Sequence, residues 1–387
     1  MDSPVTASTP CNGGGSHMKI RVFALLAALS LLLSGCGWLD GSYVSVTPHQ
    51  RRQNPQTEVV AASNYSELVE ALETVIAAGT ETAAINVSEY PPSALERGVE
   101  LAAKHVMQYD AVAAYAVKDI QCEMGTSAGQ PAVAVRVQYH HGRPEIQQIR
   151  HVRDSQEAKK ITAEALEGFE PGIVLLIEKY ENRDYTQFVQ DYAQQNPQIV
   201  METPQVTEAV YGSGGSRVVE LVFAYQNSRD NLRRMRNQVS PVFDSAVLYV
   251  SGDDAPRQKY AQLYAFLMER FDYKIETSIT PAYSLLRHGV GDSRAFATVY
   301  AAMCRGAGLD CMVITGTHDG EPWTWNLVRE NGTYYHVDLL QCSASGGFQE
   351  RRDWEMGEYV WDYSMYPGGG MGRENSWPEE TETAQKK

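Results

Sequence analysis

The sequence predicts an α+β protein in which two related α/β modules precede a separate C-terminal domain. The modules are predicted because residues 59–145 and 146–228 both alternate, in the same order, between helical and strand-like hydrophobic periodicity. Residues 229–367 differ, because a long helical stretch leads into an apolar helix followed by two strand-like segments. A chain of 387 residues is long for one globular unit, which agrees with this division.

The N-terminal region carries a secretion signal. From Met18 the sequence reads MKIRVFALLAALSLLLSGCG, in which basic residues precede an apolar run from Val22 to Leu33. That run is shorter than the about 20 apolar residues that a spanning helix needs, so we expect a signal peptide. Its Leu-Ser-Gly-Cys ending resembles a bacterial lipobox, which implies cleavage before Cys36 and a diacylglycerol on its thiol. An ordinary signal peptide with an incidental cysteine is the alternative.

The N-terminal segments predict where the protein lies, and the net charge excludes one class of partner. Residues 1–35 comprise an upstream segment and the signal peptide, and the polar residues 36–58 form a tether. We therefore expect a protein of the cell membrane, lipid-anchored on the extracytoplasmic face. The formal charge of −15 and the absence of a basic stripe in the sequence argue against a nucleic-acid partner.

The first module, residues 59–145, reads as helix, strand, helix and strand. Apolar residues recur at helical spacing between Asn64 and Ala78, and a strand-like segment follows at residues 81–90. The segment PPSALERGVELAAKHV opens with prolines, which suit the first turn of a helix. The alternating segment PAVAVRVQY then predicts a strand at residues 131–139.

The second module, residues 146–228, repeats this order. Helical segments are expected at residues 154–169 and 185–197, and strands at residues 171–180 and 217–226. Neither module has a glycine-rich phosphate loop after a strand or a His/Cys cluster at metal-ligand spacing. We expect no metal or organic cofactor, and we expect the modules to serve as a scaffold, spacer or docking surface.

The most informative stretch runs from Gly289 to Asp338. It reads GVGDSRAFATVYAAMCRGAGLDCMVITG, then WTWN, then GTYYHVDLL. Ser293, Ala297, Tyr300 and Cys304 recur at helical spacing and predict a buried helix that begins at the serine. The two downstream segments read as strands.

This stretch resembles the core of the transglutaminase-like superfamily, whose relatives include thiol proteases and peptide-processing enzymes. The resemblance covers about residues 255–366 and implies a papain-like fold. In the family, a Cys opens the helix, a His heads an HAWN-type strand, and an Asp follows on the next strand. Those positions correspond here to Ser293, Trp323 and Asp338.

Two of the three residues that would carry out the family's reaction are therefore replaced. A Cys at a helix N-terminus is stabilised as a thiolate by the helix dipole and an imidazolium, whereas a Ser needs a base to remove its proton. The indole of Trp323 has one donor and no basic lone pair. Because triad members act as a unit, we predict that the inherited mechanism is lost and that the protein is not an enzyme.

We expect the domain to act as a binding or interaction module, and two alternatives to this role remain. His336 lies two residues from Asp338, on the same side of the strand, and would make a hydrolase or acyl transferase if it reached Ser293. The other alternative is a structural component of the cell envelope that acts through the N-terminal modules.

Aromatic residues around the predicted cleft suggest a ligand surface, because such side chains bury large areas and keep a polar handle. We expect the ligand to be a peptide or a cell-wall glycan, given the family and the location. Core packing is the alternative for each residue, above all for Trp325, because active relatives also have it. The expected ligand-contacting residues are Trp323, Trp325, Tyr335, Trp354 and Trp361.

The remaining features of the sequence are four cysteines and the C-terminal end. Cys122, Cys304, Cys311 and Cys342 allow one disulfide bridge or buried free thiols, and the sequence leaves both open. Residues 368–387 are glycine-rich and then acidic, which predicts a disordered tail.

Overall fold

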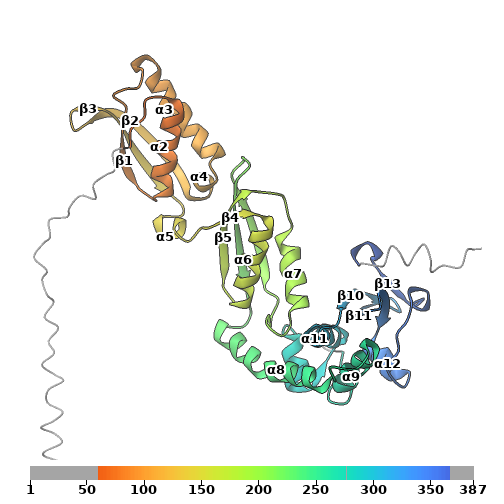
Figure 1. Ribbon diagram of the computed structural model, residues 1–387. Helices are drawn as coiled ribbons and strands as arrows, with labels where there is room; N and C mark the ends of the chain where they lie inside the picture. The colour runs from red at the N-terminus through yellow and green to blue at the C-terminus, as the bar shows by residue number, and fades with distance from the viewer. Residues whose placement is uncertain (1–59, 276, 367–387) are drawn as a thin grey trace, which may run out of the picture. The chain divides into compact units, whose positions relative to one another are not determined.

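The computed structural model describes residues 60–275 and 277–366 (Figure 1). Cys36, the predicted signal peptide and tether, and the predicted tail lie outside the described residues. The described chain forms one three-stranded sheet, two four-stranded sheets and a two-stranded sheet. None of its helices is long and apolar enough to cross a membrane.

The first sheet is antiparallel, in the order β1-β3-β2. Helices α2 and α3 pack apolar side chains such as Leu72 and Val106 against one face of it, on residues that include Ile85 and Val135. The elements are α2 (Tyr65–Ala77), β1 (Thr82–Asn86), α3 (Pro92–Tyr109), α4 (Ala111–Ala116), β2 (Val117–Ser127) and β3 (Gln130–Tyr139).

The second sheet has the order β4-β5-β7-β6, with β4 parallel to β5 and the other pairs antiparallel. Its core contains Leu166 from α6, Val189 from α7 and Leu175 from β5. The elements are α5 (Arg143–Ile146), β4 (Arg150–Asp154), α6 (Ser155–Glu167), β5 (Gly172–Lys179), α7 (Tyr185–Gln195), β6 (Gln205–Tyr211) and β7 (Arg217–Ala224).

The two sheets share one topology. In each, the strand between the helices pairs with the last strand, which forms a hairpin with the strand before it. A parallel contact precedes both, namely the Ala61–Asn86 bridge in the first and the β4–β5 pair in the second. The predicted order of helix, strand, helix, strand is therefore incomplete. It omits the edge strands β2, β4 and β6, because they carry no clear alternation of apolar and polar residues.

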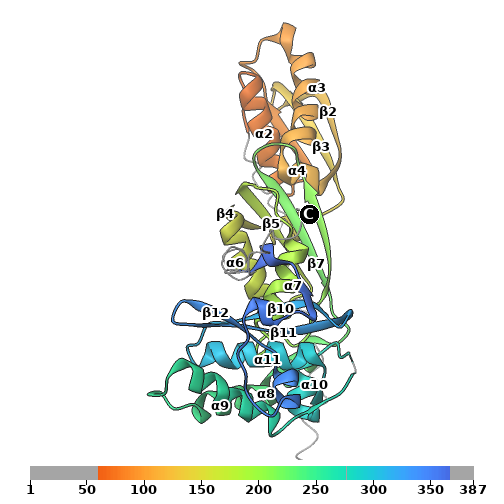
Figure 2. The ribbon, with the colours of Figure 1, turned by 90° about the vertical axis from the view of Figure 1, so that its right-hand side faces the viewer.

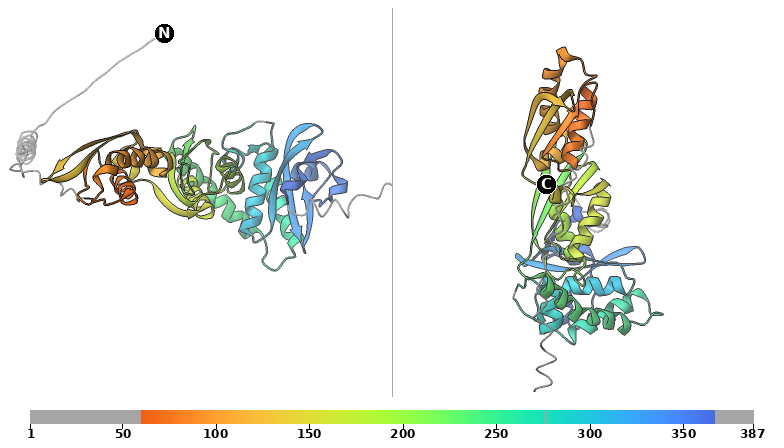
Figure 3. Two further views of the ribbon diagram at one scale, coloured as in Figure 1. Left: turned by 90° about the horizontal axis from the view of Figure 1, so that it is seen from above. Right: turned by 90° about the vertical axis from the view of Figure 1, so that its left-hand side faces the viewer.

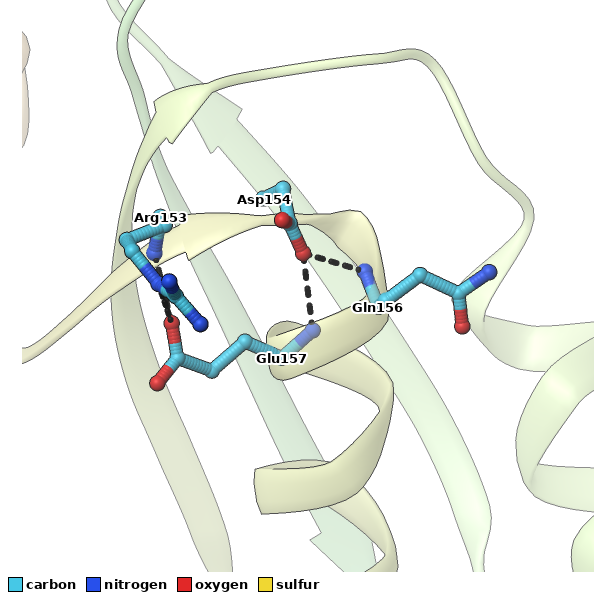
Figure 4. A network of polar contacts seen from close by, with 4 residues as sticks. All are labelled: Arg153, Asp154, Gln156 and Glu157. Carbon is cyan, nitrogen blue, oxygen red and sulfur yellow. Dashed lines mark hydrogen bonds and ion pairs between the residues drawn. The ribbon is translucent and has the colours of Figure 1, made fainter.

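Helix α6 of the second module and helix α2 of the first begin in the same way. Asp154 accepts hydrogen bonds from the backbone N–H groups of Gln156 and Glu157, at 3.0 Å each, and Glu157 accepts one from the N–H of Arg153 (Figure 4). In α2, Asn64 accepts from the N–H of Glu67, whose carboxylate accepts from the N–H of Ser63. These reciprocal bonds satisfy N–H groups that the helix leaves free, so each fixes where its helix starts.

The C-terminal sheet is antiparallel, in the order β12-β11-β10-β13. Its strands are β10 (Cys311–His318), β11 (Glu321–Glu330), β12 (Thr333–Val337) and β13 (Tyr359–Trp361). The separate two-stranded sheet is parallel and consists of β8 (Asp272–Tyr273) and β9 (Val290–Gly291). The helices are α8 (Arg229–Tyr249), α9 (Pro256–Met268), α10 (Pro281–His288), α11 (Ser293–Gly306) and α12 (Leu339–Ala344), with 3-10 turns at Asp353–Glu355 and Tyr363–Met365.

Helix α11 lies between this sheet and helices α8, α9 and α10 (Figures 2 and 3). It is buried along nearly its whole length, as the sequence predicts. On the opposite face of the sheet, Ile314 of β10, Trp325 of β11 and Tyr359 of β13 share a second core with Met356, which precedes β13. The alternation of side chains along β11 sends Trp325 into this second core and Asn326 towards α11.

Candidate functional site

Ser293 is the first residue of α11. Asp292 caps the helix, because its carboxylate accepts a 2.8 Å hydrogen bond from the N–H of Ala295. Ser293 itself is 9% exposed. The serine therefore occupies the place at a helix N-terminus that the family gives to its nucleophile, where the helix dipole favours negative charge.

Trp323 and Asp338 are in direct contact. The indole Nε1 of Trp323, on β11, donates a 2.6 Å hydrogen bond to Oδ2 of Asp338, which follows β12. Asp338 is 5% exposed. Two of the three predicted site residues are thus brought together, and the indole makes the bond that an imidazole would make to this carboxylate in a complete triad.

Asp338 accepts hydrogen bonds on both of its oxygens. Besides Trp323, the hydroxyl of Tyr359 donates to Oδ2 at 2.8 Å. Oδ1 accepts from the N–H groups of Leu340 and Gln341, at 3.0 and 3.1 Å, so the carboxylate also caps α12. Burial, and then the charge of Asp338, raise the pKa of Tyr359 well above its usual range, which keeps the phenol protonated and able to donate. Asp338 is held as a structural carboxylate.

Further aromatic rings surround Trp323. Its ring centroid lies 5.9 Å from that of Tyr273 and 5.6 Å from that of His318, and His318 stacks on Tyr359 at 4.3 Å. Burial raises the pKa of Tyr273, with smaller contributions from the charges of Asp292 and Asp338, so this phenol is close to both carboxylates. Tyr273 nevertheless remains 40% exposed, so this group of aromatic rings is accessible to solvent at Tyr273.

Neither Tyr273 nor His318 was predicted from the sequence. Tyr273 stands on a strand of two residues, which is too short for a periodic signal. His318 could have been found, because the Asp319-Gly320 pair that follows it is a typical hairpin turn and sets it opposite the strand of Trp323.

His336 is not part of this group of polar contacts. It is 2% exposed, and its Nδ1 lies 3.0 Å from Nε1 of Trp325 while its Nε2 lies 3.1 Å from Oδ1 of Asp353. An indole can only donate, so Nδ1 is the acceptor and the ring proton resides on Nε2, facing Asp353. In the described part of the chain, no hydrogen bond joins His336 to Ser293 or Asp338. The Ser293-His336-Asp338 arrangement is therefore not assembled.

Two of the expected ligand-contacting residues are core residues instead. Trp325 is 1% exposed and Trp361 is 7% exposed, and both pack behind the sheet. Trp361 stands on β13, the edge strand next to β10, and its ring packs against those of Trp325 and His336 instead of facing a ligand. Tyr335 and Trp354 lie on either side of Arg352, with ring centroids 4.5 and 5.6 Å from its guanidinium carbon, and Trp354 is 51% exposed.

Asn326, which is also present in the family's HAWN pattern, has a structural role. Its side-chain amide donates to the backbone oxygens of Ala297 and Met312, at 2.8 and 3.3 Å. The first bond fastens β11 to α11, which fixes the strand that carries Trp323 against the helix that begins at Ser293.

The four cysteines in the described residues are free thiols. Cys304, Cys311 and Cys342 are buried, whereas Cys122 is half-buried. Burial raises the pKa of Cys342 to about 11 and that of Cys304 well above its usual range. Neither thiol is prepared as a nucleophile, since that role requires the thiolate.

Residues 245–343 match the model of the Transglutaminase-like superfamily. The chain is also similar to a solved TGase, at 8% identity over 64% of this chain and 69% of the other, with a TM-score of 0.26. A candidate cysteine protease from Cytophaga hutchinsonii matches at 15% identity, over 38% and 65% of the two chains, with a TM-score of 0.24. A candidate protease from Parabacteroides distasonis matches at 8% identity, over 66% and 40%, with a TM-score of 0.22. No curated protein sequence matches the chain.

Proposed function

Because residues 245–343 form a transglutaminase-like domain, we propose that this domain binds an extended peptide without cleaving it. We further propose that a lipid on Cys36 holds the protein at the extracytoplasmic face of the cell membrane. The observation that supports the loss of catalysis is the hydrogen bond from Nε1 of Trp323 to Asp338. In this bond, an indole stands where the reaction needs a base.

Neither proton-transfer step of the family's mechanism has a group to perform it. The hydroxyl of Ser293 must lose a proton before it can attack a carbonyl carbon, and the indole of Trp323 cannot accept one. Asp338 already accepts bonds from Trp323, Tyr359 and two backbone N–H groups. The arrangement keeps the scaffold of the site but not its chemistry.

The alternative of a serine hydrolase has less support. His336 would have to give up its bonds to both Trp325 and Asp353 and leave a buried position to serve Ser293. Breaking them would leave buried polar groups unpaired, at about 1–3 kcal/mol for each group.

Exposed apolar residues on the segment that follows Tyr273 support a peptide as the ligand. Tyr273 contacts the Trp323 ring, and on the same segment Ile275 is 87% exposed and Ile279 is 47% exposed. Exposed apolar groups next to a buried polar site are typical of surfaces that receive the side chains of a partner. A cell-wall glycan would instead require aromatic faces and few aliphatic groups.

A binding experiment tests this proposal. The full chain is exposed to an array of random synthetic peptides and to muropeptides from digested cell wall, and it is compared with Tyr273→Ser and Ile275→Ser variants. The matched control is Leu248→Ser, because Leu248 is 85% exposed on α8 and lies on a different element. We expect both site variants to weaken peptide binding about tenfold, a loss of about 1.4 kcal/mol, and the control to leave it unchanged.

The other outcomes of this experiment distinguish the alternatives. Retention of the glycan from amidase-treated muropeptides, which carries no stem peptide, together with no retention of any synthetic peptide, would replace the peptide ligand by a glycan. Binding that all three variants leave unchanged would contradict a role for the cleft. It would favour the alternative of a structural envelope component that acts through the N-terminal modules.

A further inference from the structure

A second cluster of polar side chains lies at the end of the β10–β11 hairpin. Strand β10 ends at His318, Asp319 begins the turn, and Glu358 immediately precedes β13. β13 pairs with β10 so that Tyr359 lies opposite His318, and the N–H of Asp319 donates a 3.0 Å hydrogen bond to the backbone oxygen of Glu358. Backbone pairing thus brings the three side chains together.

The three side chains converge without hydrogen bonds among them. Nε2 of His318 lies 3.8 Å from Oδ2 of Asp319 and 3.6 Å from Oε2 of Glu358. One donor atom from each residue lies within 4.8 Å of the other two. A point equidistant from three atoms with these separations lies about 2.4 Å or less from each, close to the 2.0–2.2 Å of zinc bonds to imidazole nitrogen and carboxylate oxygen.

The imidazole is the fixed member of the cluster. The His318 side chain is only 11% exposed, and its ring is held by stacking on Tyr359 at 4.3 Å and by contact with Trp323. In the described residues, no hydrogen bond occupies its Nε2, which faces both carboxylates. This differs from His336, where both nitrogens are engaged. A buried imidazole whose free nitrogen faces carboxylates is suited to a metal ligand.

The two carboxylates complete the ligand set from the solvent side. Asp319 and Glu358 have side chains that are 70% and 74% exposed, so each can turn by a few tenths of an ångström to meet an ion. Two anionic oxygens and one neutral imidazole would offset the charge of a divalent cation. Imidazole favours zinc and related transition metals, whereas calcium and magnesium prefer oxygen ligands alone.

We propose that His318, Asp319 and Glu358 form a binding site for a divalent transition metal, with zinc as its occupant. Water fills the remaining coordination positions, since no other donor joins the cluster in the described residues. The ion ties the β10–β11 turn to the start of β13. It also adds a constraint next to the vacated site, because the ring of Tyr359 carries the hydroxyl that bonds Asp338. The site does not depend on whether the cleft binds peptide.

Calorimetric titration of zinc chloride into the metal-stripped full chain tests the proposal. We expect one saturable site in the wild type. Asp319→Asn and Glu358→Gln should each weaken zinc binding by about tenfold or more, because loss of a direct ligand costs at least as much as loss of a supporting one. His318→Phe keeps a ring to stack on Tyr359 and should abolish the site. The matched control is Asp244→Asn, which removes an exposed carboxylate from α8 and should leave the titration unchanged.

A second readout keeps the test independent of how well the variants fold. The exposed positions of Asp319 and Glu358 allow folded variants, which circular dichroism verifies. Saturating zinc should raise the melting temperature of the wild type, raise that of Glu358→Gln by less, and leave that of His318→Phe unchanged, because only an ion bound to the folded state stabilises it. Absence of a saturable site in the wild type, or equal affinity in wild type and Glu358→Gln, would overturn the proposal. So would calcium binding as tightly as zinc, because an imidazole ligand would then contribute nothing.

Discussion

The indole Nε1 of Trp323 donates a 2.6 Å hydrogen bond to Oδ2 of Asp338. In the triad of the superfamily, an imidazole would pair with this carboxylate and exchange protons with the nucleophile. The indole preserves the contact with the carboxylate but has no nitrogen that can take a proton. One substitution therefore keeps the local structure and removes the base.

Replacing Trp323 by Phe should destabilise the protein without unfolding it. The ring would keep its contacts with Tyr273 and His318, but Asp338 would lose one of its donors. A hydrogen bond to a charged group contributes about 1.5–3 kcal/mol, so we expect the free energy of unfolding in urea to fall by that amount. Trp354→Phe is the control, since Trp354 is 51% exposed, and should change it by about 0.5 kcal/mol or less. Equal effects of the two changes would mean that the indole–carboxylate bond contributes nothing.

Asp338→Asn should be more damaging. The amide has the shape of the carboxylate, but its NH₂ group would face either the Trp323 and Tyr359 donors or the two backbone N–H groups of α12. The NH₂ group would then face two other donors without an acceptor between them. We expect this to lower the free energy of unfolding by about 2–4 kcal/mol. Asp362→Asn changes an exposed capping carboxylate in the same way and should have a much smaller effect on the urea midpoint. A larger loss at Asp362 would contradict the role assigned to Asp338.

The thiols should differ in their reaction with iodoacetamide in the native protein. The thiolate is the reactive form, and burial raises the pKa of Cys342 to about 11, so this thiol is almost wholly protonated at pH 8. Its rate of alkylation should rise as the pH increases towards 11 and should be much slower at lower pH. Cys122, which is only half-buried, should react before Cys342 and Cys304. Peptide mapping after timed alkylation measures the order, and early labelling of Cys304 would contradict its buried position.

The lipid anchor is predicted from the Leu-Ser-Gly-Cys sequence alone. In a bacterial host, the wild type should incorporate an alkyne-tagged fatty acid and sediment with membranes. Cys36→Ser should abolish both properties, because the thiol is the predicted attachment point. Cys122→Ser, the control, should retain both. Fatty-acid labelling that persists in Cys36→Ser would refute the lipobox.

The order of residues allowed most of the C-terminal domain to be predicted. The spacing from Ser293 to Cys304 gave the buried helix, and the prediction of a transglutaminase-like domain is confirmed by the family match at residues 245–343. Helices and alternating strands of the two modules were also predicted. The edge strands β2, β4 and β6 were not, because they lack the alternation of apolar and polar residues that a half-buried strand shows.

The contacts within the site depended on tertiary structure that no local pattern encodes. The position of His336 next to Asp338 suggested a possible base, but partners on β11 and in the 3-10 turn at Asp353–Glu355 take both its nitrogens. Trp361 was expected at a ligand surface and is buried because β13 pairs with β10 and sets its ring against those of Trp325 and His336. Tyr273 reaches Trp323 from a two-residue strand far away in the sequence, whereas His318 reaches it across the β10–β11 turn.

The central claim, that the site around Ser293 has no base, is tested most directly by labelling with a fluorophosphonate probe. Such probes modify only a serine whose hydroxyl is activated by a neighbouring base. The wild type, Ser293→Ala and an active serine hydrolase are treated in parallel and analysed by intact mass. We predict that the wild type remains as unlabelled as Ser293→Ala while the hydrolase is modified completely. Labelling of the wild type that disappears in Ser293→Ala would contradict the account.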